Sequence, residues 1–365
     1  MKEIRALTGL RGIAALIVFL THTRDTLAGR GLQIDVPALL ERLVFRGGPQ
    51  VDIFFVLSGF ILTLIYRDNF RDCVTASSWI EFQQRRLARI YPLHLFMLLL
   101  VLAFVMLARL TGAYVINGLD RFTLSSLPAH LLLVHAWGFL PGNGTWNPPS
   151  WSISIEFLAY LLFPFFLHFV TGFATRRALA FFFMVVAAGL LANWATPWGL
   201  TGFAGIARGL SEFALGCATV YLMAGRLATF LRGTLGGIAA LSLLAAAFSL
   251  TPDIGFAIGL AAAPLLLALT GDSLVSAFFG NRVIYFLGEI SYSVYMAHFL
   301  FSSIAYRLIS IQWMQTGTVQ LLLGLTGIVA FVLLVSTATY YGIERPGRDL
   351  LRRFAAVGAS KRAVS

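Results

Sequence analysis

Long apolar runs separated by short polar segments occupy this chain from end to end. About 20 consecutive apolar residues suffice for a helix to cross the hydrocarbon core of a bilayer. Ten runs approach or exceed this length, and each is predicted to form a transmembrane helix. They cover residues 8–25, 50–67, 90–110, 151–170, 178–194, 204–224, 234–250, 254–271, 283–309 and 319–342. The pattern predicts an all-α polytopic membrane protein, a bundle of about ten transmembrane helices.

A further apolar piece, residues 125–140, decides the topology. If it does not cross, both termini lie on one side, together with the basic connections. Those connections hold Arg67, Arg71, Arg85, Arg86, Arg89, Arg176, Arg177, Arg226, Arg232 and Arg282. Cytoplasmic loops carry an excess of Lys and Arg, so both termini are predicted to be cytoplasmic. Residues 125–140 are then an outer-face helix or a re-entrant piece. The loop 24–49, with four arginines outside, is the exception.

Composition agrees with this class. The chain has 365 residues, of which 58% are hydrophobic and 12% charged, and a mean hydropathy of +0.82. Soluble domains carry about 25% charged residues. The net charge of +11 is spread over short loops, which fits membrane topology better than a nucleic-acid partner. The lipid bilayer is therefore the expected environment, as a multi-pass protein of the bacterial inner or plasma membrane.

The two cysteines and the N-terminal residues do not change this prediction. Only two cysteines occur, Cys73 and Cys217, and neither their number nor their setting suggests a disulfide or a metal site. Lys2 and Arg5 precede an apolar run as in a signal peptide. No small-residue cleavage pattern follows and many further spans do, so a cleaved leader is not expected.

The first apolar run carries Arg11 and His22. Their spacing of eleven residues places them about 16 Å apart along a helix, roughly half the hydrocarbon thickness. Charged or titratable groups at such depth are costly and often functional. Asp25 shares a face with His22 and could orient the imidazole as a general base. The structural alternatives are a snorkelling arginine, a hydrogen-bonded core histidine and an Asp25 that simply accompanies Arg24.

Residues 48–60 (GPQVDIFFVLSGF) begin the second span. Asp52 in its first turn complements the helix dipole, which is one sufficient reason for an acid there. Ser58 and Gly59 lie about two turns deeper. A pair of small residues permits close approach of another helix or of a narrow ligand.

A basic segment, residues 78–92 (SWIEFQQRRLARIYP), precedes the third span. Ser78 and Glu81 form a capping-box pattern that predicts a helix start. Pro92 is expected to end or kink this helix. Guanidinium groups bind phosphate oxygens bidentately, so three arginines within five residues are a candidate phosphate clamp. These are Arg85, Arg86 and Arg89; ordinary positive-inside charge is the alternative.

Residues 147–157 (NPPSWSISIEF) begin the fourth span. Ser150 can cap the helix, and Ser152 and Glu156 lie four residues apart on one face. A carboxylate more than a turn into a span must be paired or protonated. The expected partner is a cation of the outer half: His22, Arg208 or His298.

Residues 291–298 (SYSVYMAH) place Ser291, Tyr295 and His298 on one helical stripe, with Tyr292 beside it. By the predicted topology His298 lies towards the outer half. Interhelical hydrogen bonding alone would also explain this stripe.

Together these segments resemble the membrane acyltransferase-3 family, which O-acylates extracytoplasmic glycans and related molecules. The matching pieces are the Arg11–His22 spacing, VDIFFVLSGF, RRLARIYP, WSISIE, SYSVYMAH and the terminal YYGIERP. They run in order through nearly the whole chain. The resemblance implies a ten-helix bundle, residues 1–346, followed by a basic cytoplasmic tail, 347–365. An esterase-like domain, often fused in this family, is not seen, so transfer would be completed alone or through a separate partner.

The resemblance also implies roles. Acyl-CoA, with acetyl as the expected acyl group, would be the donor substrate, and no permanent cofactor is expected. His22 would be the catalytic base and Arg11 essential, with Arg85, Arg86 and Arg89 on the donor side. The residue patterns described above add Asp25 and Glu156 as assisting groups. The donor would be held by the three arginines and Ser58. The predicted pocket is formed by Asp52, Trp151, Ser152, Tyr292, His298 and Arg208.

The acceptor is left open among lipopolysaccharide, exopolysaccharide, a lipid-linked or other oligosaccharide and a small secreted molecule. A different class, a transporter or flippase of a lipid-linked or polysaccharide substrate, is also rich in intramembrane charge. Such proteins usually show internal repeats, and none is evident here. A purely structural membrane protein would not carry the buried Arg, His and Glu.

Overall fold

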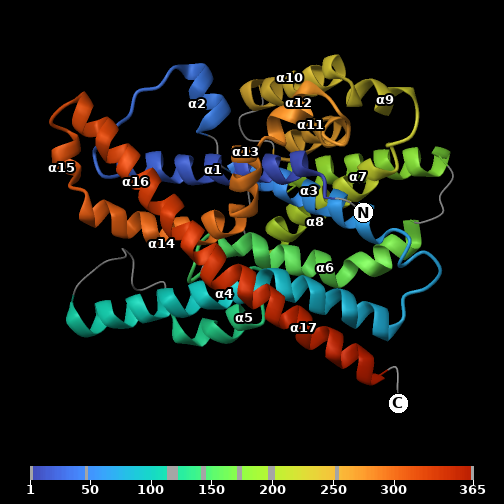
Figure 1. The fold of residues 1–365 in the computed structure, drawn as a ribbon, viewed down its shortest axis with the longest axis horizontal. Coiled ribbons are helices and arrows are strands. Elements are labelled where there is room, and N and C mark those ends of the chain that lie inside the picture. The colour runs from blue at the N-terminus through green and yellow to red at the C-terminus, as the bar shows by residue number, and fades with distance from the viewer. Residues whose placement is uncertain are drawn as a thin grey trace. The chain divides into compact units, whose positions relative to one another are not determined.

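The computed structural model describes residues 3–45, 48–112, 122–140, 145–170, 175–195, 202–250 and 255–362. Within these residues all regular structure is helical (Figure 1). The longer helices are α1 (Arg5–Ala28), α3 (Gly48–Tyr66), α4 (Ala76–Thr111), α6 (Ser150–Val170), α7 (Thr175–Ala195), α8 (Gly202–Val220), α10 (Thr234–Leu250), α11 (Gly255–Ala268), α14 (Ser291–Leu308), α16 (Thr318–Thr339) and α17 (Arg345–Arg362). The shorter ones are α2 (Ala38–Val44), η2 (Leu124–Ser126), α5 (Leu127–Leu131), α9 (Arg226–Arg232), α12 (Leu274–Phe279), α13 (Arg282–Glu289), α15 (Ile311–Met314) and η3 (Tyr340–Glu344).

Each of the ten apolar runs coincides with a helix or a helix pair, which confirms the all-helical prediction. Among the described residues, five helices are long and apolar enough to cross a membrane. Two bent pairs, α9 with α10 at 88° and α13 with α14 at 64°, raise this number to seven if each pair is one span. The chain is thus a multi-pass membrane protein. The count of ten and the sidedness of the termini stay predictions.

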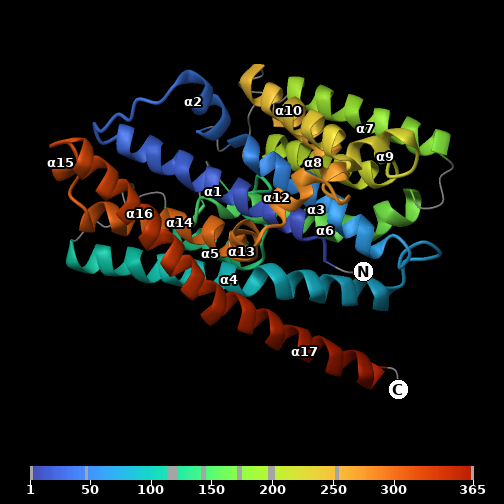
Figure 2. The same ribbon diagram turned by 45° about the horizontal axis from the view of Figure 1, so that its top comes forward.

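The helices form two compact units, and each is described by itself. Unit 1 comprises Met1–Thr21, Asp35–Val74 and Ile155–Ser291. Its centre is the packing of α3 against α8, and α7 and α11 pack beside them. Figure 2 shows α3, α7 and α8. A Cβ atom on Gly59 would lie 2.0 Å from the Phe213 carbonyl oxygen, and one on Gly216 only 1.9 Å from that of Val56. Glycine is therefore needed on both helices for their backbones to approach this closely.

Unit 2 comprises His22–Ile34, Thr75–Ser154 and Tyr292–Ser365. α17 packs along α4, and the π-helical turn η3 joins α17 to α16 (Figures 1 and 2). The predicted boundary at residue 346 falls inside α17, so the described part of the tail, up to Arg362, continues as a helix.

The capping box predicted for α4 is wrong. The helix begins after Thr75, whose hydroxyl accepts from the Ser78 N–H while the Ser78 hydroxyl accepts from the Thr75 N–H. The capping box thus lies one turn upstream of the Ser78–Glu81 pair, and Glu81 bonds Arg85 instead. Pro92 does not end the helix, which continues to Thr111, and a kink at this residue stays a prediction.

The segment 125–140 contains only the short helices η2 and α5. Five residues of α-helix are too few to cross a bilayer. The prediction that this segment does not span as a helix is therefore confirmed, and its two histidines, His130 and His135, are buried.

Candidate functional site

α1 carries both of the residues that the sequence analysis placed first. Arg11 is half-buried in the part of α1 that belongs to unit 1, and His22 is exposed in the part that belongs to unit 2. The helix is continuous between them, so the predicted separation of about 16 Å along its axis stands. Asp25 forms a 2.8 Å ion pair with Arg24. That contact is the structural alternative considered for Asp25, and an orienting role towards His22 stays a prediction.

His22 stacks on His298, with ring centroids 5.1 Å apart and planes inclined by 25°. His298 is only 2% exposed, and its Nδ1 lies 3.2 Å from the carbonyl oxygen of Val294. A carbonyl oxygen only accepts, so Nδ1 carries the proton and Nε2 is the acceptor of this ring. The buried imidazole therefore has a defined tautomer, and its face fixes the plane of the exposed His22 ring.

The His22–His298 stack continues into a short polar chain. The ring of Tyr295 lies 6.1 Å from that of His298, and its hydroxyl is 2.8 Å from the Ser152 hydroxyl of α6. Tyr295, His298 and Ser152 thus form one group, as predicted for the first two by their stripe on α14. Ser291 does not join them, since its hydroxyl donates to the Gly288 carbonyl. Trp151, beside Ser152, is buried.

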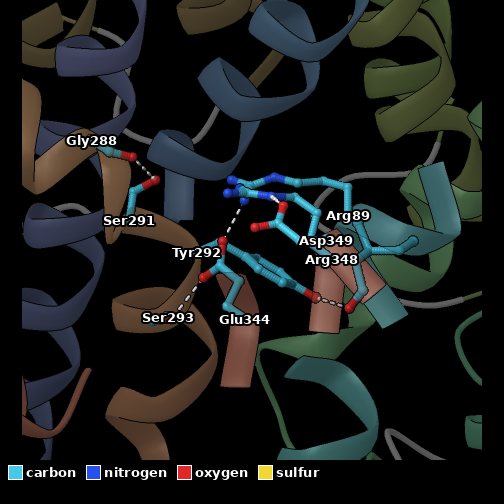
Figure 3. A network of polar contacts seen from close by, with 9 residues as sticks. Arg89, Gly288, Ser291, Tyr292, Ser293, Glu344, Arg348 and Asp349 are labelled. Carbon is cyan, nitrogen blue, oxygen red and sulfur yellow. Dashed lines mark hydrogen bonds and ion pairs between the residues drawn. The ribbon is translucent and has the colours of Figure 1, made fainter. Parts of the chain in front are cut away.

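A second polar group of unit 2 surrounds Arg89 (Figure 3). Arg89 is ion-paired with Glu344 of η3, a carboxylate that is 1% exposed. The Ser293 hydroxyl donates to the other carboxylate oxygen of Glu344 at 2.7 Å. The Arg89 guanidinium also lies 5.6 Å from the centroid of the Tyr292 ring, whose hydroxyl donates to the Ile90 carbonyl. Arg89 is therefore held on several sides.

The three predicted donor arginines differ in their surroundings. Arg86 is half-buried, with its guanidinium 5.6 Å from the centroid of the Phe82 ring. Arg85 is exposed and pairs with Glu81 at 2.5 Å. The structure thus places Arg86 and Arg89 further inside unit 2 than Arg85.

α14 connects the two polar groups of unit 2. Tyr292, which faces Arg89, and His298, which faces His22, are six residues apart on this helix, about 9 Å along its axis. A guanidinium suited to an anion and an exposed imidazole are therefore joined by a single rigid element. Such a spacing suits an elongated substrate with a charged end and a reactive end.

Glu344 was missed by the sequence analysis. It belongs to the terminal motif YYGIERP, where an acid follows an apolar run and precedes Arg-Pro. It lies in a π-helical turn, in which the Arg345 N–H donates to the Tyr340 carbonyl five residues earlier. Such turns are often found at functional sites. An isolated acid at the end of a span was the available signal.

In unit 1, Asp52 forms a bidentate pair with Arg208 at 2.6 and 2.9 Å. Asp52 is fully buried, so the predicted dipole interaction is not its main role. Arg208 lies also 3.9 Å from Glu212, a second fully buried acid that the sequence analysis missed. Glu212 is four residues from Arg208 on α8, and that spacing was the signal for it.

The prediction that Glu156 pairs with a cation is wrong. Its Oε1 accepts from the hydroxyls of Ser58 at 2.6 Å and Tyr160 at 2.5 Å. Arg208, one of the expected partners, is engaged by Asp52. Hydroxyl donors from α3 and α6 satisfy the carboxylate at a smaller desolvation cost than a second buried charge. Ser58 therefore contacts Glu156 rather than standing alone as a small residue.

Three imidazoles stack in unit 2. The ring centroids of His130 and His135 are 4.2 Å apart, and those of His94 and His135 5.8 Å apart. His130 accepts at Nε2 from the Trp146 N–H, and its Nδ1 donates to the Ser126 carbonyl. Burial lowers the pKa of His130, and burial together with the neighbouring imidazoles lowers that of His135 to about 2. The lowered pKa values keep the imidazoles of His130 and His135 uncharged at neutral pH.

Within the described residues, no group of three or more His, Cys, Asp or Glu side chains is placed to hold a metal ion. The two polar groups of unit 2 contain imidazole, guanidinium and hydroxyl groups. These are groups for proton transfer and anion binding.

Comparison with known proteins decides the class. Residues 4–341 match the model of the acyltransferase-3 family, described as an acyltransferase domain. The chain belongs to the acyltransferase-3 family. It is therefore an enzyme that transfers acyl groups, which confirms the resemblance and decides against the transporter and structural alternatives.

Two named proteins are similar in sequence to this acyltransferase. "Acyltransferase MdmB" of Streptomyces mycarofaciens is 30% identical over 96% of this chain and 93% of its own length. "Putative peptidoglycan O-acetyltransferase YrhL" of Bacillus subtilis (strain 168) is 27% identical over 46% of this chain and 24% of its own length. No solved structure matches the chain.

Proposed function

We propose that this acyltransferase moves an acyl group, with acetyl as the expected one, from cytoplasmic acyl-CoA to a hydroxyl of an extracytoplasmic glycan. The observation that carries the proposal is the arrangement along α14. In the middle of this helix His298 is buried and stacks on the exposed His22, and about 9 Å from it along the helix axis Tyr292 faces Arg89. Acyl-CoA likewise carries its charge and its reactive group at separate positions, with phosphates at one end and a thioester at the other.

The donor end follows from charge. Coenzyme A carries several phosphates, and guanidinium groups bind phosphate oxygens in a bidentate way. Arg86 and Arg89 lie on α4, in the basic connection that topology assigns to the cytoplasm. Glu344 and Tyr292 hold Arg89 in place, so less side-chain entropy is lost when an anion binds. Arg85, paired with Glu81 at the surface, would contribute less.

The chemical step follows from His22. Its imidazole removes the proton of the acceptor hydroxyl, and the oxygen attacks the thioester carbonyl. The carbon–sulfur bond breaks, the ester forms, and the coenzyme A thiolate leaves and is protonated. His298 acts as a positioning residue through the stack.

A variant of this step passes through an acyl group on His22, which the acceptor hydroxyl then removes. It uses the same residues, and the acceptor oxygen forms the same final ester. Mass spectrometry of the His22 peptide, after quenching with donor present and acceptor absent, distinguishes the two routes, since only the second leaves an acyl mass there.

The acceptor class is the least constrained part. The name of one relative refers to peptidoglycan O-acetylation, over less than half of this chain. This favours a saccharide hydroxyl over a small secreted molecule. Comparison of surface glycans from cells with and without the protein, by mass spectrometry, identifies the acceptor through the lost acyl mass.

The test of the base uses His22→Ala in the full chain. We expect acyl transfer to fall by at least about 10²-fold, the usual contribution of a general base, with coenzyme A affinity unchanged. His168→Ala, which removes another histidine at the end of α6, is the matched control and should retain transfer. Undiminished transfer by His22→Ala would contradict the assignment.

A further inference from the structure

The last helix, α17, places arginines against the basic part of α4. α17 packs along α4, where Gly347 lies so close to Pro92 that a Cβ atom would be 2.6 Å from the proline ring. The charges that act on Arg352 include those of Arg86, Arg89 and Arg348. Figure 3 draws Arg348 and Asp349 within the same network as Arg89 and Glu344. Two helices thus contribute to one cationic cluster.

This cluster has more positive than negative charge. Its four guanidiniums are those of Arg86, Arg89, Arg348 and Arg352. Glu344 is engaged by Arg89, and Asp349 lies 3.7 Å from Arg348. Arg348 and Arg352 are four residues apart on α17, a spacing at which like charges repel. A surplus of about two positive charges is stabilised best by a bound polyanion.

An open groove flanks the cluster. Its volume is about 580 Å³, and it is lined by Tyr341, Arg345, Pro346, Asp349, Leu350 and Arg353. Tyr341 is 49% exposed, and its ring makes a T-shaped contact with the Tyr340 ring at 5.0 Å, so an accessible aromatic side chain lines the groove. An aromatic face beside two further guanidiniums suits a nucleotide, whose base stacks while its phosphates pair.

We infer that α17 is part of the donor site and binds the 3′-phosphorylated adenosine diphosphate portion of acyl-CoA. The inference rests on the proposed function, because it assumes the donor that Arg86 and Arg89 are proposed to bind. The phosphates would lie on the four-arginine cluster, and the adenine in the groove beside Tyr341. The tail after residue 346 is then a substrate-binding element and not only a topology signal.

The same chemistry could recognise the phosphate of an anionic lipid. α17 also exposes Leu350 and Phe354, and basic helices with apolar faces bind anionic membrane surfaces. The arrangement favours coenzyme A over an anionic lipid. The cluster includes Arg89, which pairs with the buried Glu344 and faces Tyr292, so this guanidinium lies inside unit 2. The experiment below distinguishes coenzyme A from an anionic lipid as the ligand whose phosphate is bound.

The experiment measures binding of coenzyme A, 3′-dephospho-coenzyme A and pantetheine to the purified full-length protein. Three proteins are compared: the wild type, Arg348→Ala/Arg352→Ala, and the control Arg67→Ala/Arg71→Ala. The control removes the same charge from an exposed loop of unit 1. We expect the α17 variant to bind coenzyme A roughly tenfold more weakly and pantetheine unchanged, with smaller loss for the dephospho form. The control should match the wild type.

Equal coenzyme A affinity of the α17 variant and the wild type would overturn the inference. In lipid nanodiscs with and without phosphatidylglycerol, a variant that loses only lipid binding would reassign the cluster to the membrane. Absence of coenzyme A binding by the wild type, with no acyl-CoA-dependent transfer, would overturn the proposed function itself. Arg348→Gln/Arg352→Gln provides a second variant of similar volume if the alanine form does not purify.

Discussion

Glu344 pairs with Arg89 across 255 residues of sequence. The carboxylate is almost fully buried, and Ser293 donates to its second oxygen. A charge removed from water needs such partners, because an unpaired ion in this setting is strongly destabilising. The pair thus fixes both the stability of unit 2 and the direction of the guanidinium that we propose to hold the donor.

Replacement of Glu344 by alanine leaves Arg89 without its carboxylate. We expect the free energy of unfolding to fall by about 3 kcal/mol, the usual cost of breaking a buried pair. Chemical denaturation in detergent micelles measures this. The double variant Arg89→Met/Glu344→Leu should recover most of the stability, since an apolar pair of similar volume often replaces a buried ion pair without loss. Coenzyme A affinity should be lower in the double variant than in the wild type, because the Arg89 guanidinium is absent.

Close packing of α3 and α8 gives a second prediction. A methyl group on Gly216 would lie 1.9 Å from the Val56 carbonyl oxygen. Gly216→Ala should therefore separate the helices and destabilise unit 1 by about 3 kcal/mol or more. Gly342→Ala is the control, because no heavy atom lies within 4 Å of the added carbon. Thermal unfolding distinguishes them, and similar melting temperatures would refute the packing argument.

The stacked imidazoles give a pH dependence. Burial lowers the pKa of both His130 and His135 in the folded protein. Below pH 6.5 the unfolded chain therefore takes up protons that the folded protein does not, and stability falls as the pH decreases from about 6.5 towards 2. At pH 5 the loss due to His135 is about 2 kcal/mol relative to neutral pH, and His130 adds to it in the same direction.

Denaturation at pH 7.5 and pH 5 measures this loss. His135→Phe keeps an aromatic ring in the stack and removes one titrating group, so we expect the pH-dependent loss to become smaller. A wild type equally stable at both pH values would show that the stack does not exclude protons.

Asp52 and Glu212 share one guanidinium. Both acids are fully buried, and Arg208 is bidentate to Asp52 but 3.9 Å from Glu212. Glu212→Gln removes the surplus acid at constant shape, so we expect stability to be unchanged or slightly higher. Asp52→Asn breaks the bidentate pair and should cost about 3 kcal/mol. The reverse order in a denaturation series would show that Glu212 is the main partner of Arg208.

Much of the fold follows from local pattern. The apolar runs coincide with helices because a bilayer leaves few alternatives to helical backbone. The stripe of Tyr295 and His298 follows from the helical repeat alone. Arg86 and Arg89 follow Phe82 by four and seven residues, so they are expected near its face of α4 from sequence distance alone. These features need no long-range information.

The partners across helices are what sequence does not predict. Glu156 meets the hydroxyl of Ser58, 98 residues away, although a cation was expected on grounds of charge. Glu344 and Arg89 are further apart still. Which helix faces which is decided by the summed packing of many side chains, and no single residue type encodes it. Local sequence patterns can also suggest the wrong residue. The pattern pointed to Ser78 as the first residue of the α4 capping box, whereas the capping box begins at Thr75.

The π-helical turn Tyr340–Glu344 joins α16 to α17. A turn of this kind holds one residue more than an α-helical turn would. Deleting a single residue there, for instance Gly342, would leave an ordinary α-helical turn, so the direction of α17 relative to α16 would be nearly unchanged. The same deletion inside the α-helical part of α16, where each residue contributes about 100° of rotation, would turn Arg348 and Arg352 away from α4. The π-helical turn is thus a point at which the chain length can change by one residue while the last helix presents its charge in the same direction.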